Sequence, residues 1–306
     1  NTISIVILAA GILLGVVNMT QKKGFFNLGI DFSSGTKLTI TSNETIDLDE
    51  VKTLMAETGF DGFTYQSAGD NAVYAITKQS LTTDELNTIK EVYIEAYGIE
   101  PGDNVVTPVV GRDLVRNAFI LTIVAWIAMM IYVTIRFEWD YALGCITALL
   151  HDVGIVLAVF SILRMEVNIE LISVLLTIIG YSINNSIVVF DRVREMLKDV
   201  KRKPNKEMYR DLVNRALDAT IKMSINSSIT TILPVIVLLV IGSRAIITFM
   251  VAMFIGLIAG TISSIFVAPT VWIWARDHFK PHEKKTKKKW EDKEHLDEYT
   301  IKGINA

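Results

Sequence analysis

Long apolar runs separated by short polar connections make up most of the chain. They cover residues 3–19, 114–135, 141–163, 169–190, 221–241 and 245–275. About 20 apolar residues in helical form span the hydrocarbon core of a bilayer, and the first run is near the minimum length. Residues 20–113 differ, because their apolar positions recur at the spacings of an ordinary folded domain. The pattern predicts a polytopic α-helical membrane protein with six transmembrane helices and one domain outside the membrane.

The domain at residues 20–113 reads as alternating strands and helices. Residues 37–41 have the alternation of a strand, and residues 47–58 have the spacing of a helix. Two further strands flank the turn-rich residues 68–71, which is a hairpin signal. Thr82 and Glu85 form a capping box before a second helix, and a last strand follows. The order βαββαβ predicts an α+β domain of the ferredoxin-like type.

Positive charge in the connections predicts the orientation in the membrane. The connection at residues 191–222 carries ten Lys and Arg, and residues 276–306 carry nine, against one each in residues 164–168 and 242–244. Positively charged connections stay in the cytoplasm. We therefore expect both termini and the loop at residues 191–220 to be cytoplasmic, and residues 20–113 to be extracytoplasmic.

These boundaries divide the chain into four parts. Residues 1–19 are expected to form a retained first transmembrane helix, and residues 20–113 the outer domain. Residues 114–275 are expected to form transmembrane helices two to six, and residues 276–306 a basic cytoplasmic tail. Such a tail can bind anionic lipids or an acidic partner, or it can stay solvated.

Composition excludes several classes of protein. The chain is 51% hydrophobic, with a mean hydropathy of +0.40 and a formal net charge of -3, which is not typical of a soluble protein. Its single cysteine, Cys145, cannot form a disulfide within the chain, and there is no Cys/His spacing typical of a metal site. No nucleophile–base set or phosphate-binding loop is visible. We therefore expect no enzymatic activity, no cofactor, no metal and no nucleic-acid partner.

Residues 177–195 place polar side chains in the fourth apolar run. Asn184 and Asn185 lie near its end, followed by Asp191 and Arg192. On a helix one face would carry small and polar residues: Ser173, Thr177, Gly180, Asn184 and Asp191. The opposite face, which we expect to meet lipid, is apolar: Ile178, Ile179 and Val189. The polar face indicates either a site on a transport path or a seam between packed helices.

Two other polar groups lie inside apolar runs. His151 and Asp152 occupy the centre of the third run, and an ionisable residue in the membrane is by default a functional hypothesis. Histidine can also change charge near neutral pH. The alternative is a hydrogen-bonded pair that holds two helices together. Ser224, Ser228 and Thr231 would form one hydroxyl face of the fifth run, either as part of an ion path or bonded to their own backbone near a proline.

Five motifs together resemble the SecF family. They are GIDFSSGT at residues 29–36, RFEWDYALG at 136–144, LLHDVGIV at 149–156, TIIGYSINNSIVVFDRVRE at 177–195 and INSSITTILP at 225–234. The resemblance implies a membrane domain of the resistance-nodulation-division type in the bacterial cytoplasmic membrane. It implies a SecD-like partner, the SecYEG translocon, YidC and YajC as further partners, and unfolded secretory proteins as cargo. It also implies use of an ion gradient, with proton or sodium as the coupling ion.

The chain departs from the SecF pattern at two positions. Asn185 stands where the family has an acid, and Met223 stands where the family has an arginine. Losing both charges together predicts that the ion-titrating acid lies in the partner subunit. Two alternatives stay open. One is a structural half without ion coupling of its own, and the other is a small exporter of lipid or solute, which would normally carry two membrane halves.

Overall fold

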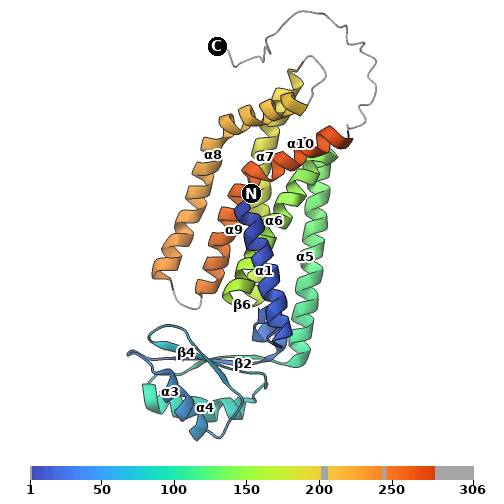
Figure 1. Cartoon of the computed structure of the whole chain (residues 1–306). Coiled ribbons are helices and arrows are strands. Elements are labelled where there is room, and N and C mark those ends of the chain that lie inside the picture. The colour runs from blue at the N-terminus through green and yellow to red at the C-terminus, as the bar shows by residue number, and fades with distance from the viewer. Residues whose placement is uncertain (1, 201–205, 243–245, 280–306) are drawn as a thin grey trace, which may run out of the picture.

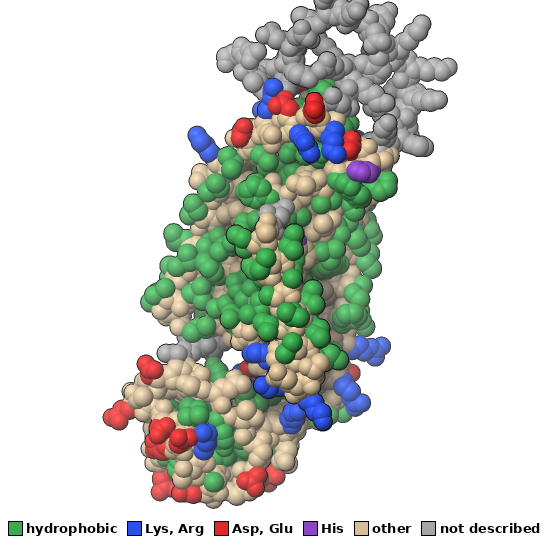
Figure 2. All heavy atoms as spheres, in the orientation of Figure 1, with side chains coloured by type: hydrophobic (Ala, Val, Ile, Leu, Met, Phe, Trp, Pro, Cys, Tyr) green, Lys and Arg blue, Asp and Glu red, His purple; other side chains and the backbone are tan. Residues whose placement is uncertain are grey.

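The computed structural model describes residues 2–200, 206–242 and 246–279. Within this part of the chain, six helices are long and apolar enough to cross a membrane, as predicted. They are α1 (Thr2–Thr20), α5 (Pro108–Arg136), α6 (Trp139–Leu163), α7 (Ile169–Lys198), α8 (Lys206–Ile241) and the stretch Ile247–Phe279. On the face shown in Figure 2, hydrophobic side chains cover the middle of these helices, and charged side chains gather at both ends.

The helix ends differ from the expected boundaries in two places. The expected loop at residues 191–220 is largely helical, because α7 continues to Lys198 and α8 begins at Lys206. The sixth apolar run is divided into α9 (Ile247–Phe266) and α10 (Ala268–Phe279), which bends away from α9 (Figure 1). Pro269 accounts for the break, since proline lacks an N–H and is favoured only in the first turn of a helix. The basic tail beyond Phe279 lies outside the described residues.

A small α+β domain lies at one end of the helices (Figure 1). It contains β2 (Gly35–Thr41), α3 (Leu48–Glu57), β3 (Thr64–Ser67), β4 (Ala72–Thr77), α4 (Thr83–Tyr97) and β5 (Gly102–Val106), in the predicted βαββαβ order. The strands pair antiparallel in the order β3-β4-β2-β5. Alternate residues of β2, such as Leu38 and Ile40, are buried with residues of α3 and α4 to form the core. The capping box of Thr82 and Glu85 is present, and its hydrogen bonds lower the pKa of Glu85.

A short joint connects this domain to the membrane helices, and the sequence patterns did not predict it. It consists of β1 (Asn27–Leu28), α2 (Ile30–Ser33) and β6 (Glu166–Val167), where β6 lies between α6 and α7. β1 pairs parallel with β6. The Arg164 guanidinium donates hydrogen bonds to backbone carbonyls of the segment after α1, at Lys23, Gly24 and Phe25.

The GIDFSSGT motif contains α2, and the motif and the lysine that follows it make further contacts at this joint. Asp31 accepts a hydrogen bond from the backbone N–H of Ile169 at 3.1 Å, which satisfies a free donor at the start of α7. Lys37 of β2 forms an ion pair with Glu166 at 3.1 Å. Gly35 has a φ of 137° and lies so close to β4 that an added Cβ would be 2.1 Å from the Thr77 carbonyl oxygen. The motif therefore fixes the position of the domain relative to the α6–α7 connection.

α7 and α9 pack closely in the bundle, where small residues allow the helices to approach. An added Cβ at Gly256 would lie 1.9 Å from Cδ1 of Ile178. One turn on, a Cβ at Gly260 would lie 3.2 Å from Cβ of Ser182. Ser264, at the next step of four, is also buried. Gly256, Gly260 and Ser264 therefore form the seam against which α7 packs.

Replacing Gly256 with Leu is expected to lower the free energy of unfolding by about 1–3 kcal/mol, because α7 has no space for the side chain. Gly180→Ala is the matched control on α7, since a Cβ at Gly180 meets nothing within 4 Å. That control should leave stability unchanged or slightly raised. Thermal unfolding of the purified chain in detergent measures both. Equal stability of the two variants would show that α7 and α9 are not packed at Gly256.

Candidate functional site

The most buried charged group in the middle of the membrane helices is the carboxylate of Asp152 on α6. Its side chain is enclosed where α6, α7 and α9 meet, with a relative exposure of 0%. Its Oδ2 accepts hydrogen bonds from Ser182 of α7 at 2.5 Å and from Ser263 of α9 at 2.8 Å. Gly260 of α9 lies beside this site, since a Cβ there would be in van der Waals contact with Oδ2 at 3.6 Å. The two hydroxyl donors suit an ionised carboxylate, which can only accept.

His151 completes the site from the same helix. Its Nδ1 lies 3.0 Å from Oδ1 of Asp152. Its Nε2 is buried and has no hydrogen-bond partner among the described residues. His151 is 12 residues from either end of α6, which is about 18 Å along the axis and places it near the middle of a bilayer. The structure therefore brings together the two predicted residues and two serines that the sequence analysis did not single out.

A cluster of hydroxyl groups lies beside the carboxylate. The Tyr181 hydroxyl is 2.7 Å from Oγ of Ser228 and 3.3 Å from Oγ1 of Thr261, and Ser228 and Thr261 are 2.9 Å apart. This cluster joins α7, α8 and α9, and Tyr181 precedes Ser182 in the chain. Ser228 also donates to the backbone carbonyl of Ser224 at 2.7 Å.

The three hydroxyl residues expected on one face of α8 differ in burial. Ser224 and Ser228 are buried, and Oγ of Ser224 has no partner among the described residues. Thr231 is exposed, and its hydroxyl donates to the backbone carbonyl of Ser227 at 2.9 Å. Thr231 therefore lies apart from the site around Asp152.

The expected orientation of α7 was wrong. The face that we expected to meet lipid is buried: Ile178, Ile179 and Val189. Most of the small and polar face is exposed on the surface of the chain: Ser173, Thr177, Gly180 and Asn184. The physical reason is the α9 seam, whose small residues let the apolar side of α7 pack closely.

The two adjacent asparagines consequently have different surroundings. Asn185 is buried, and its amide nitrogen has no hydrogen-bond partner among the described residues. Asn184 is exposed. Met223 is 64% exposed on α8, so it does not point into the bundle where Asn185 is buried. The structure thus gives no sign that these two positions meet within this chain.

Asp191 and Arg192 lie apart from the Asp152 site, near the end of the bundle opposite the α+β domain. Asp191 forms an ion pair with Arg136 of α5 at 3.3 Å. Arg192 pairs with Glu195 on its own helix at 2.6 Å. Asp191 is nine residues beyond Ser182 on α7, or about 14 Å along the helix. Asp191 therefore connects α7 with α5, whereas the Arg192 pair lies on the surface of α7 alone.

A buried ion pair at the same end was not predicted. Arg276, which the sequence analysis placed in the basic tail, is buried in α10 with a relative exposure of 7%. Its Nε lies 3.0 Å from Oδ2 of Asp140, whose exposure is 0%, and its Nη1 lies 2.8 Å from Glu138. The guanidinium also lies over the rings of Tyr141 and Trp272. The acids of the RFEWDYALG motif therefore hold α6 to α10.

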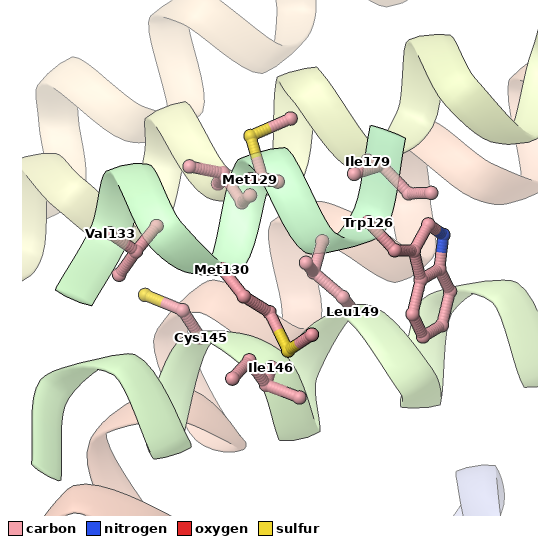
Figure 3. Close-up of a pocket in the computed structure, with 9 residues that line it drawn as sticks. Trp126, Met129, Met130, Val133, Cys145, Ile146, Leu149 and Ile179 are labelled. Atoms are coloured by element: carbon pink, nitrogen blue, oxygen red, sulfur yellow. The ribbon is translucent and has the colours of Figure 1, made fainter. Parts of the chain in front are cut away.

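A separate pocket lies between α5, α6 and α7 (Figure 3). Apolar side chains and one cysteine line it: Trp126, Met129, Met130, Val133, Cys145, Ile146, Leu149, Ile179 and Ile183. It contains none of the predicted site residues and no charged group. Cys145 is a free, buried thiol. Within the described residues, no three His, Cys, Asp or Glu side chains gather as a metal site.

Comparison with protein families places the chain among known membrane proteins. The family model "Protein export membrane protein SecD/SecF, C-terminal" matches residues 90–278. The chain is 35% identical over 263 residues to the protein translocase subunit SecF of Rickettsia bellii, covering 83% of this chain and 85% of that protein. It is 34% identical to the SecF subunit of Helicobacter pylori, with 95% and 91% of the two chains covered.

The chain is also similar to larger relatives and to solved structures named SecDF. The chain is 37% identical to the protein translocase subunit SecDF of Bacillus subtilis, covering 81% of this chain but 34% of that protein. A crystal structure of SecDF from Thermus thermophilus, described as a translocon-associated membrane protein, matches with a TM-score of 0.78 and 30% identity, covering 90% of this chain and 38% of that chain. SecDF in a super-membrane-facing form matches with a TM-score of 0.59. The chain thus spans about a third of the SecDF relatives and most of the SecF relatives, and it belongs to the SecD/SecF family of protein export membrane proteins.

Proposed function

We propose that this chain is a SecF-type subunit that assists the translocation of unfolded secretory proteins across the bacterial cytoplasmic membrane and draws on an ion gradient. The observation that carries the proposal is its near full-length correspondence with SecF chains named as protein translocase subunits. The buried Asp152 and His151 supply an ionisable site at mid-membrane depth, where such groups are costly and usually functional. No catalytic activity and no cofactor are needed beyond proton or sodium as the coupling ion.

A SecD-like partner is part of this proposal. Polar side chains of α7 and α8 are exposed on the surface of the chain: Ser173, Thr177, Asn184, Asn226 and Thr230. Polar groups in a membrane normally face protein or water, so a second membrane protein is expected to cover them. The SecDF relatives, of which this chain matches about a third, carry additional chain that could supply this partner. SecYEG, YidC and YajC are further partners that the family resemblance suggests.

Orientation follows from the same proposal. The α+β domain is taken as extracytoplasmic and ferredoxin-like, which its antiparallel strand order β3-β4-β2-β5 supports. Both termini are taken as cytoplasmic, because the Lys and Arg residues concentrate in residues 191–222 and 276–306. The domain would then meet cargo as it leaves the membrane. From residue 20 to 113 the chain has 15 Asp and Glu against 7 Lys and Arg, so that surface is acidic.

A second candidate is a structural half of the complex that does not couple to ions. Asn185 favours it, because its buried amide cannot titrate and stands where the SecF pattern has an acid. The two candidates share partners and location, and they differ in whether any group of this chain exchanges an ion.

Complementation tests the proposed function. Cells depleted of their own SecF-type subunit would receive this chain, and processing of a pulse-labelled secretory precursor would be followed. We expect faster processing with the chain than without it, and co-purification of a SecD-like protein in mild detergent. Unchanged processing, with the chain present in the membrane and bound to its partner, would overturn the proposal.

A further inference from the structure

The His151–Asp152 pair has an unusual set of partners for two ionisable groups in a membrane. Asp152 has hydrogen-bond contacts at both carboxylate oxygens, from His151, Ser182 and Ser263. His151 uses Nδ1 in this contact, and its Nε2 is left buried without a partner among the described residues. A buried polar atom without a partner is costly, so Nε2 needs a functional explanation.

The exchangeable proton of the pair can be assigned to one atom. When the pair holds two protons, both ring nitrogens carry hydrogen, and the ring is an imidazolium that donates from Nδ1 to the carboxylate. When one proton has left, the remaining proton stays on Nδ1, because a proton on Asp152 would leave the ring as an imidazolate, and Nε2 has a free lone pair. Loading therefore forms one N–H bond at Nε2 with a proton from outside the pair, and unloading breaks that bond and releases the proton.

Among the residues that the structure describes, the helices packed around the pair bring no competing charge to it. α1 and α9 contain no charged residue, and α7 has none between Glu170 and Asp191. The titratable group that α7 contributes nearby is Tyr181, which is bonded to Ser228. The charges of α5 lie towards its ends, and Arg276 of α10 is paired with Glu138 and Asp140.

The charge of the site is therefore set by its own protons. With Nε2 protonated, imidazolium and carboxylate cancel. Without that proton, an uncompensated negative charge is left in the membrane interior, which is strongly unfavourable unless water or a conformational change compensates it. Loss of the proton therefore favours entry of water or a movement of the helices that compensates the charge.

α1 covers the side of α6 on which His151 lies. An added Cβ at Gly154 would lie 3.0 Å from Leu8, and one at Gly11 would lie 2.5 Å from Cβ of Ala158. His151 and Gly154 are three residues apart on α6, so they share this face. His151 and Asp152 are consecutive residues and therefore lie on different faces of α6. The histidine lies towards α1, and the aspartate lies towards α7 and α9.

We propose that Nε2 of His151 is the proton-binding atom of this chain and that Asp152 is its positioning residue, held in place by Ser182 and Ser263. The ligand is a proton rather than a metal cation, because the serine hydroxyls are already directed at the carboxylate. The link to an ion gradient rests on the proposed function, whereas proton binding itself does not. The site would let this subunit exchange an ion although Asn185 cannot.

Solid-state nitrogen NMR of the full chain in lipid bilayers tests the proposal. The other histidines are His278, His282 and His295, so changing these three to Gln leaves His151 as the single labelled imidazole. Spectra would be recorded from acidic to alkaline pH. We expect the Nε2 signal alone to move downfield as one proton is lost, while Nδ1 keeps its hydrogen throughout. A ring that never changes protonation, or one that loses its proton from Nδ1, would overturn the proposal.

Two variants test whether Asp152 positions the ring of His151 or only contributes to the packing of the helices. Asp152→Asn should abolish the preference for hydrogen on Nδ1 in the neutral ring, so that both nitrogens shift on titration. Ser161→Ala is the matched control, because Ser161 is buried on α6 but donates to the Gly11 carbonyl at 3.1 Å. It should leave the His151 spectra unchanged. An unchanged tautomer in Asp152→Asn would exclude a positioning role for Asp152.

The spectra and the complementation assay can fail independently. If the chain restores secretion but Nε2 does not titrate, the proposed function is supported and the proposed proton site is wrong. If Nε2 titrates as described but the chain does not restore secretion, the proton site is supported and the proposed function is wrong.

Discussion

Arg276→Gln is expected to lower the free energy of unfolding by about 3–5 kcal/mol, because it leaves the charge of Asp140 buried without its partner. Arg276 lies 3.0 Å from Oδ2 of Asp140, and both side chains are almost completely enclosed. Glutamine keeps some of the length of arginine but carries no charge. The contacts of the guanidinium with Tyr141 and Trp272 are lost as well. The loss should appear as early separation of α10 from α6.

Unfolding in detergent, followed by Trp fluorescence, measures this effect. Arg192→Gln is the control, since its ion pair with Glu195 lies on the helix surface and is expected to contribute about 0–1 kcal/mol. The double variant Asp140→Asn with Arg276→Gln should recover part of the lost stability, because the effects of two substitutions on the free energy of unfolding are not additive when the residues are in contact. If the Arg276 and Arg192 variants lose the same stability, the pair does not hold α10 in place.

Asp152→Leu is expected to impair both stability and secretion. It leaves the Ser182 hydroxyl and the ring of His151 without their acceptor, at roughly 1–3 kcal/mol for each buried donor left unpaired. The Ser263 hydroxyl keeps its contact with the Gly260 carbonyl at 3.2 Å. Asp152→Asn keeps the size of the side chain, so its loss of stability should be smaller. Its gradient-dependent secretion should still fall, because an amide does not hold Nδ1 of His151 as a carboxylate does.

Ser161→Ala is again the matched control, with an expected loss of about 1 kcal/mol for one hydrogen bond and normal secretion. Unfolding in detergent and processing of a secretory precursor would be measured for all three variants. Normal secretion by Asp152→Asn at every pH tested would show that the charge of Asp152 is not used. Equal instability of Asp152→Leu and Ser161→Ala would show that the carboxylate is not the centre of a buried network.

Much of the fold follows from local patterns. The six membrane-spanning helices were predictable because a run of about 20 apolar residues has few other stable arrangements. The capping box of Thr82 and Glu85 and the strand–helix order of residues 35–106 are also local signals. The seam of Gly256 and Gly260 was predictable from small residues at steps of four.

Local patterns could not predict which face of α7 is buried in the bundle and which face is exposed. In a membrane, a polar face can turn towards the bundle of its own chain or towards another protein, and the periodicity is identical. The choice was decided by Gly256, 78 residues away from Ile178 in sequence. Long-range pairs such as Asp140 with Arg276, and the two-residue pairing of β1 with β6, likewise left no local signal.

The candidate site was predictable in part. His151 and Asp152 stood out because they are ionisable residues at the centre of an apolar run. Ser182 and Ser263 did not, because single serines in membrane helices usually bond to their own backbone. A signal did exist for both. Ser182 lies inside the polar motif of α7, and Ser263 follows Gly260 by three residues, so both were candidates for contacts between helices.

Translocation into membrane vesicles tests directly whether this chain assists protein export. Vesicles from cells depleted of their SecF-type subunit would be prepared with and without this chain, at matched levels of SecYEG and SecD, and import of a labelled secretory precursor would be measured by protease protection. We expect faster import with the chain and loss of that gain when an ionophore dissipates the proton gradient. Equal import with and without the chain would contradict a role in translocation.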